Sequence, residues 1–215
     1  RAPDLAYLLD SPIEVSDHEL REWNTGAGAD EQTFRMAIHH LGTDREIDLY
    51  VEQVKLVVEE SAAVFGEFPR FDFGSYTFLV DYLPWADGDA MEHRNSTFLV
   101  SASDLARNAD RLIETLAHEF FHVWNVERIR PRSLEPFEFD EAAFSDDLWF
   151  AEGFTNYYDG LLLVRSGVWD LQRWALDLSV AVERIVNSPA TRYGSAIEMS
   201  RQAVFRDRGQ WADPQ

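Results

Sequence analysis

The chain has 215 residues, of which 46% are hydrophobic and 27% are charged, and its formal net charge is −20. These values are typical of a globular protein with a substantial core, and such an acidic surface disfavours nucleic acids and anionic membranes as partners. Cysteine is absent, which excludes disulfides and thiolate ligands and leaves His and carboxylate side chains to hold any metal.

No apolar run approaches the roughly 18 residues needed to cross a membrane. The chain opens RAPDLAYLLD, which has no basic and then apolar leader of the kind found in signal peptides. We therefore expect a soluble protein without membrane insertion. The sequence leaves the compartment and the oligomeric state open.

The first predicted elements are a strand and a helix. Residues 31–41 place apolar side chains at alternate positions, which predicts a half-buried strand. Thr43 and Glu46 have the spacing of a capping box, and apolar residues follow at helical spacing, which predicts a helix over 47–65.

Two further strands are predicted over 76–82 and 96–100, because β-branched and aromatic residues dominate both stretches. Residues 84–95 lie between them and contain many polar side chains. We expect this connection to form a polar loop.

The remaining elements are predicted helices. Ser103 or Asp104 can cap a helix that runs to about Val126, with apolar positions in the rhythm of a core-facing stripe. Strongly apolar sequence predicts a helix over 147–167, and another is predicted over 170–186.

Strands thus dominate residues 1–102 and helices dominate residues 103–215, an order that indicates an α+β fold. We treat the two parts as one domain, because 215 residues suffice for a single large core.

The stretch HEFFH, His118 to His122, has the HExxH pattern of zinc peptidases. Residues four apart share one face of a helix, so His118 and His122 can both reach one ion. Glu119 lies beside the first histidine, where it can act on a water molecule as a base. The alternative is a helix that carries two exposed histidines, since so short a pattern also arises by chance.

A catalytic zinc needs a third protein ligand, and Glu152 is the candidate. It lies within the apolar stretch LWFAEGF, where a carboxylate is costly to bury unless it is paired or bound to a metal. The alternative is a carboxylate that faces solvent near the start of a helix. Thr155 and Asn156 follow on the same side of that helix and are candidates to orient the imidazoles.

The other histidines give weaker signals. His39 and His40 are adjacent in a predicted strand, so their side chains point to opposite faces and cannot chelate one ion together. His18 has no partner pattern, and His93 lies near a candidate substrate-binding stretch.

Longer stretches carry a resemblance to a known family. HEFFHVWNVERIRP and the later LWFAEGFTNYYDG, with LLDSPIE, FRMAIHHLGTD and DAMEHRNST nearer the start, closely resemble the glycyl aminopeptidase family. Its members are gluzincin metallopeptidases whose catalytic domains are related to those of thermolysin and aminopeptidase N. The resemblance implies a thermolysin-like α+β domain with a small sheet followed by a mainly helical part that carries HExxH.

The resemblance also implies a role for each site residue. His118, His122 and Glu152 match the zinc ligands, and Glu119 matches the general base. Glu92 resembles the glutamate with which aminopeptidase N holds the free amino terminus of a substrate. The implied activity is hydrolysis of the N-terminal peptide bond by Glu-assisted attack of a zinc-bound water, with a preference for small residues such as Gly or Ala.

The sequence departs from the family pattern at several positions. Asp89, His93 and Glu127 stand where we expect Gly, Asn and Lys. Relatives also carry a Tyr-Tyr-x-x-Gly stretch that we expect to stabilise the oxyanion, a PDZ domain and a preceding β-rich domain. We expect these parts to lie outside residues 1–215, which leaves a catalytic-domain fragment that is weakly active or inactive.

Three other interpretations remain open at this stage. A thermolysin-type endopeptidase would share the zinc site without needing Glu92. A zinc-binding module without activity would not need Glu119. A helical domain without metal would need neither residue.

Overall fold

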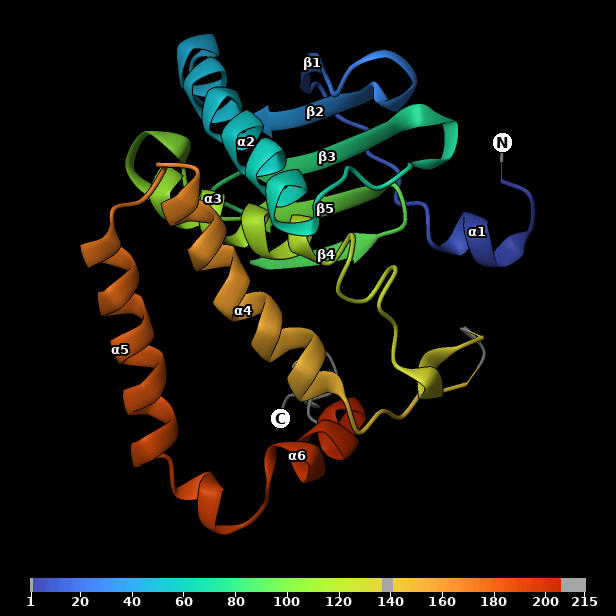
Figure 1. Ribbon diagram of the computed structural model, residues 1–215. Coiled ribbons are helices and arrows are strands. Elements are labelled where there is room, and N and C mark those ends of the chain that lie inside the picture. Colours follow the sequence, from blue (N-terminus) through green and yellow to red (C-terminus); the bar gives the residue numbers. More distant parts are fainter. Residues whose placement is uncertain (1, 137–140, 206–215) are drawn as a thin grey trace.

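The computed structural model describes residues 2–136 and 141–205, and it combines a five-stranded sheet with helices on one face of that sheet (Figure 1). The strand order is β1-β2-β3-β5-β4. The three central strands run parallel and each edge strand runs antiparallel to its neighbour. The strands are β1 (Glu19–Thr25), β2 (Gln32–His40), β3 (Ser75–Tyr82), β4 (Asp89–His93) and β5 (Ser96–Ser101). The helices are α1 (Leu5–Leu9), α2 (Asp44–Phe65), α3 (Leu105–Phe121), α4 (Leu148–Arg165), α5 (Leu171–Asn187) and α6 (Ala196–Gln202).

The core lies between the sheet and the helices α2, α3 and α4. Strand β2 alternates as predicted, and Phe34, Met36 and Ile38 on one face are 0% exposed. Phe120 of α3 packs against Phe34 and Tyr76, with ring centroids 6.0 and 5.3 Å apart. This aromatic packing fixes the position of α3 over the sheet, because large buried rings lose the most free energy when they are displaced.

The capping box of α2 is confirmed, since Thr43 and Glu46 exchange both hydrogen bonds. This helix connects the parallel strands β2 and β3 and contains 22 residues. The strand-rich first part of the chain therefore also contains a long helix, as a parallel connection requires.

The predicted end of α3 near Val126 was wrong, because the helix ends at Phe121. Beyond that point the backbone N–H of Val123 donates to Phe120 O, three residues back, at 3.2 Å. Val126 then has a φ of 126°, which a β-branched residue rarely adopts. The chain consequently turns out of the helix directly after the second histidine of HEFFH.

The expected polar loop over 84–95 is also corrected, because residues 89–93 form the edge strand β4. In its pairing with β5, Glu92 lies opposite Thr97. The Thr97 hydroxyl donates to the Met91 carbonyl at 2.8 Å. Glu92 is therefore held on a strand rather than on a loop.

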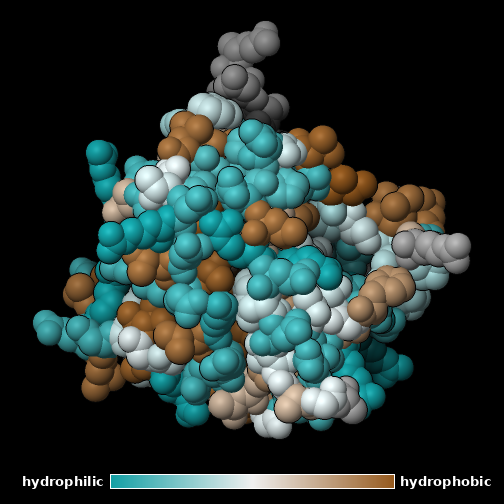
Figure 2. Space-filling model, turned by 90° about the horizontal axis from the view of Figure 1, so that it is seen from above, coloured by the Kyte–Doolittle hydropathy of each residue, from teal (hydrophilic) through white to brown (hydrophobic). Residues whose placement is uncertain are grey.

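The last helices contact the rest of the fold less closely. The structure has α5 nearly as predicted, yet none of its residues is buried, and Figure 1 shows it lying beyond α4, away from the sheet. Viewed from the side of α2 and β1, most of the surface is hydrophilic, with scattered hydrophobic patches (Figure 2). Within residues 2–136 and 141–205, no helix combines the length and the apolar character that a membrane span requires.

Candidate metal centre

Helix α3, the His122 residue that caps it, and helix α4 supply the candidate metal ligands. The apolar stripe of α3 is buried against the sheet, with Leu112, Ile113 and Leu116 at most 3% exposed. This packing turns His118 and His122 toward α4. Glu152 lies in the second turn of α4, and its side chain is 44% exposed. It reaches back to the histidines of α3, so it is not simply a solvent-facing carboxylate.

The ligand atoms converge on one point. His118 Nε2 lies 3.2 Å from His122 Nε2 and 3.2 Å from Glu152 Oε2, and His122 Nε2 lies 3.8 Å from Glu152 Oε2. Ligands at about 2.1 Å from a tetrahedral zinc are separated by about 3.4 Å. The three atoms therefore have the mutual spacing that a single zinc ion requires.

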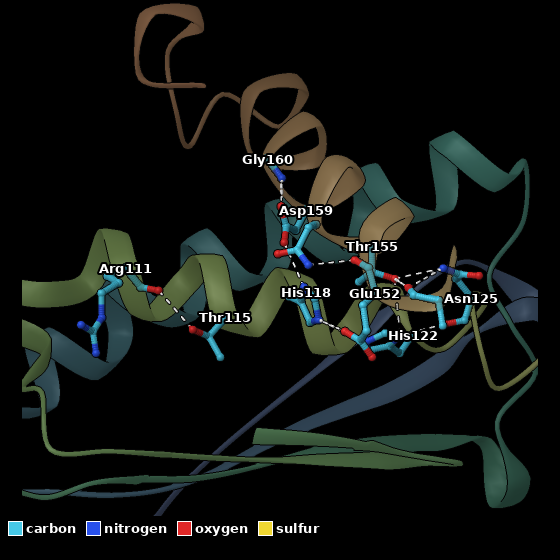
Figure 3. Close-up of polar contacts among 11 residues, drawn as sticks. Arg111, Thr115, His118, His122, Asn125, Glu152, Thr155, Asp159 and Gly160 are labelled. Carbon is cyan, nitrogen blue, oxygen red and sulfur yellow. Dashed lines mark hydrogen bonds and ion pairs between the residues drawn. The ribbon is translucent and has the colours of Figure 1, made fainter. Parts of the chain in front are cut away.

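The opposite nitrogen of each imidazole faces a hydrogen-bond acceptor (Figure 3). His118 Nδ1 lies 3.1 Å from Asp159 Oδ2, and His122 Nδ1 lies 2.8 Å from the Asn125 carbonyl oxygen. Acceptors at Nδ1 favour the tautomer whose Nε2 lone pair can bind a metal once the ring is neutral. Metal binding displaces any proton from Nε2, so the donor set fits zinc.

Asn125 links the two ligand-bearing helices. Its side-chain amide donates to the Ala151 carbonyl of α4 at 2.9 Å and to Thr155 Oγ1 at 3.1 Å. Its own carbonyl accepts the His122 proton. One buried residue, 3% exposed, thus positions a ligand and ties α3 to α4.

Of the two residues predicted to orient the imidazoles, only Thr155 lies near one of them. Thr155 Oγ1 lies 3.4 Å from His122 Nδ1, whereas the Asn156 amide bonds to the Glu152 carbonyl of its own helix. Sequence reasoning missed Asp159 and Asn125. Asp159 lies seven residues after Glu152, on the same face of α4, and that spacing was a usable signal.

The carboxylates around the imidazoles create a negative site. Burial alone would lower the pKa of His118, but hydrogen bonds to Asp159 and Glu152 outweigh it and raise that pKa to about 10. Burial, reinforced by the charges of Glu92 and Glu152, raises the pKa of Glu119 to about 8 although His118 opposes the shift. A site with this excess of carboxylates favours a bound cation.

Glu92 faces the same site from β4. One carboxylate oxygen each of Glu92 and Glu119 and one ring nitrogen of His122 lie within 4.8 Å of one another. All three line a cleft of about 870 Å³ whose other walls include residues of α1 and of the segment 126–135. The edge strand thus brings Glu92 beside the candidate metal ligands.

The remaining candidates lie elsewhere or have structural partners. His93 Nδ1 is 2.8 Å from Asp10 Oδ1, and Arg130 pairs with Glu127 at 3.3 Å. Tyr157, Tyr158 and Tyr193 do not line the cleft. Tyr158 stacks on Phe121, Tyr157 contacts Trp174, and Tyr193 is 84% exposed.

Comparisons with known proteins found one family and several similar structures. Residues 111–214 match the M61 glycyl aminopeptidase family. An aminopeptidase N family protein from Idiomarina loihiensis has a similar crystal structure, with 27% identity and a TM-score of 0.58 over 73% of this chain and 27% of that chain. An M1 zinc metallopeptidase from Deinococcus radiodurans is 15% identical, with a TM-score of 0.49 over 92% of this chain and 46% of that chain. No curated protein matches the chain.

The chain spans 27% and 46% of the lengths of those two proteins. The range matched by the family contains His118, Glu119, His122 and Glu152. The mixed sheet and the helices that carry these residues agree with the similarity to the Idiomarina protein. Just under half of the chain, residues 111–214, is therefore similar to the M61 glycyl aminopeptidase family, and this part contains the candidate ligands.

Proposed function

We propose that residues 1–215 form a thermolysin-like catalytic domain of a zinc aminopeptidase of the gluzincin group. The observation that carries the proposal is the convergence of His118, His122 and Glu152 beside the buried carboxyl group of Glu119, in an open cleft. A purely structural zinc site has no need of such a carboxylate, whereas peptide hydrolysis requires a base.

The proposed roles follow from the chemistry of each group. His118, His122 and Glu152 would hold zinc, which supplies Lewis-acid activation of a water and of the scissile carbonyl. Glu119 takes the proton of the attacking water and passes it to the nitrogen of the leaving amine. Burial favours the protonated form of Glu119 that exists between these two transfers.

Glu92 is proposed to bind the substrate's free amino group. An ammonium ion pairs well with a carboxylate held on a strand, because the carboxylate is already positioned for it. With the ammonium fixed beside the metal ligands, the first peptide bond of the substrate is the one that reaches Glu119. A preference for small first residues, Gly or Ala, is proposed from the family.

Tyr157, Tyr158 and Tyr193 do not line the cleft, whereas Tyr7 of α1 does. We therefore propose no role in oxyanion stabilisation for Tyr157, Tyr158 or Tyr193.

The test compares a glycine-terminated or alanine-terminated peptide with its N-acetylated form on the zinc-loaded chain. Mass spectrometry of long incubations should detect release of the first residue from the free-amine peptide and no cleavage of the acetylated one. Equal cleavage of both peptides would contradict the aminopeptidase proposal in favour of a thermolysin-type endopeptidase. Products that persist in a Glu119→Gln preparation would reveal a contaminating protease.

A further inference from the structure

A segment between α1 and β1, residues 11–18, runs along the face of the sheet opposite the core, and we call it the N-terminal strap. Figure 1 shows it passing behind the sheet on its way to β1. Its side chains are oriented against expectation: Ile13 and Val15 are 79% and 89% exposed, whereas Glu14 between them is half-buried. This orientation is unfavourable, because it turns a carboxylate toward the sheet and two aliphatic side chains toward water. It is expected only if the carboxylate has a partner on the sheet.

The partners are His39 and Asp81, which lie directly opposite each other in the pairing of β2 and β3. One ring nitrogen of His39 and one carboxylate oxygen each of Glu14 and Asp81 all lie within 4.8 Å of one another. His39 Nδ1 is 3.3 Å from Asp81 Oδ1, close to the separation of about 3.4 Å expected between ligands on one zinc ion. Three segments of the chain therefore bring one nitrogen and two oxygen ligands together.

Asp81 faces both other members of the cluster. Its Oδ1 is shielded from solvent and lies at ion-pair distance from His39. Burial and then the nearby charge of Glu14 raise the pKa of Asp81. Two carboxyl groups this close repel each other when both are ionised, and a cation between them removes the repulsion.

We propose that Glu14, His39 and Asp81 form a second metal site, which binds a divalent transition-metal ion such as Zn²⁺. The imidazole ligand favours such an ion over Ca²⁺ or Mg²⁺, which prefer sites made of oxygen. The ion would fasten the N-terminal strap to the sheet. The strap follows α1, and both Tyr7 of α1 and Asp10, which caps it, line the candidate cleft. The ion would therefore also stabilise one wall of that cleft.

The test counts zinc on the stripped and reloaded chain by mass spectrometry of the metal after gel filtration. We expect two equivalents for the wild-type chain, and one each for Asp81→Asn and for Glu14→Gln. His18→Ala is the matched control, because it removes an exposed histidine outside the cluster, and it should keep two. Glu152→Ala should lose only the zinc ion of the candidate catalytic centre. The count therefore distinguishes a failure of that proposed centre from a failure of the second site.

A second readout follows the strap itself. Hydrogen exchange of residues 11–18 should slow when zinc is added to the wild-type chain and should not respond to zinc in Asp81→Asn. The proposal would be overturned if Asp81→Asn and Glu14→Gln both retained two equivalents of zinc. It would also be overturned if zinc did not change hydrogen exchange in the strap of the wild-type chain. A shared proton between Glu14 and Asp81 would then explain the cluster.

Discussion

Glu119 is almost fully shielded, at 7% exposure, whereas Glu152 opens to the cleft. The two side chains are thus suited to different tasks. An exposed oxygen can approach a metal, and a buried carboxyl group whose pKa is raised to about 8 accepts and returns a proton within the pH range of most cells. The proposed division of roles between Glu119 and Glu152 rests on this difference in environment.

Glu119→Gln tests that division. The amide keeps the size of the side chain but cannot accept a proton, so we expect zinc binding to persist while turnover falls by about 10²- to 10⁴-fold. Zinc content and peptide cleavage should be measured on one preparation. Retained turnover would show that another group is the base, and lost zinc would show that Glu119 is itself a ligand.

Glu114 provides a pH-dependent prediction at the scale of one residue. Burial, and then the charges of Asp177 and Asp159, raise its pKa to about 7 in the folded chain. Below about pH 4.3 the carboxyl group is protonated in both the folded and the unfolded chain, and its contribution to stability is fully present. As the pH rises from about 4.3 toward 7, the unfolded chain releases this proton more readily than the folded chain, and that stability is lost. Above pH 7 the ionised carboxylate is a net penalty.

Glu114→Gln should therefore raise the free energy of unfolding of the metal-free chain at pH 8. Because the side chain is half-buried, solvent screening reduces the effect to about 1 kcal/mol. At pH 4 the gain should vanish. Urea unfolding at both pH values measures it, with the exposed Glu59→Gln as the control. A gain of equal size at pH 4 would show that the effect is not ionisation of Glu114.

At the scale of elements, the site depends on how α3 and α4 are joined. Asn125→Ala removes the amide that bonds to Ala151 and Thr155. We expect zinc affinity to fall by about 10- to 100-fold, as for other losses around metal ligands, and the free energy of unfolding to fall by about 1–3 kcal/mol.

Competition with a chromophoric chelator measures the zinc affinity of this variant. Asn156→Ala is the control, because its amide bonds only within α4 and its removal should leave zinc affinity nearly unchanged. Equal losses from both variants would mean that the link between the helices is not what positions His122.

Local spacing predicts some of these elements and not others. The alternation of Phe34, Met36 and Ile38 identified β2, and the i, i+4 histidines identified the ligand pair, because each pattern lies within one element. Strand β4 was missed because an edge strand pairs on one side only, so its exposed polar residues resemble those of a loop.

The contacts of His118 with Asp159 and of His122 with Asn125 needed the packing of α3 against α4. The turn at Val126 leads the chain away from α3 and presents the Asn125 carbonyl to His122. The sequence does not predict this turn, because a β-branched residue rarely adopts a positive φ. The sequence therefore predicts the candidate ligands, but it does not predict most of the groups that orient them.

At the scale of the whole molecule, 39 acidic side chains face only 19 basic ones. Their mutual repulsion opposes the compact state, and salt screens it over a Debye length of about 10 Å at 0.1 M. We expect the Tm at neutral pH to rise with sodium chloride. The rise should disappear near pH 4.5, the isoelectric point. A Tm that falls with salt at neutral pH would show that ion pairs such as Arg201–Asp146 outweigh the repulsion.

In the proposed catalytic centre, one zinc ion joins α3 to α4 at HEFFH. Anomalous diffraction at the zinc edge, from crystals of the zinc-loaded chain, tests it most directly. We expect a peak at about 2.0–2.2 Å from His118 Nε2, His122 Nε2 and a Glu152 oxygen, with both Nδ1 atoms still bonded to Asp159 and Asn125. A loaded crystal without a peak there, or a peak bound through Nδ1, would contradict it.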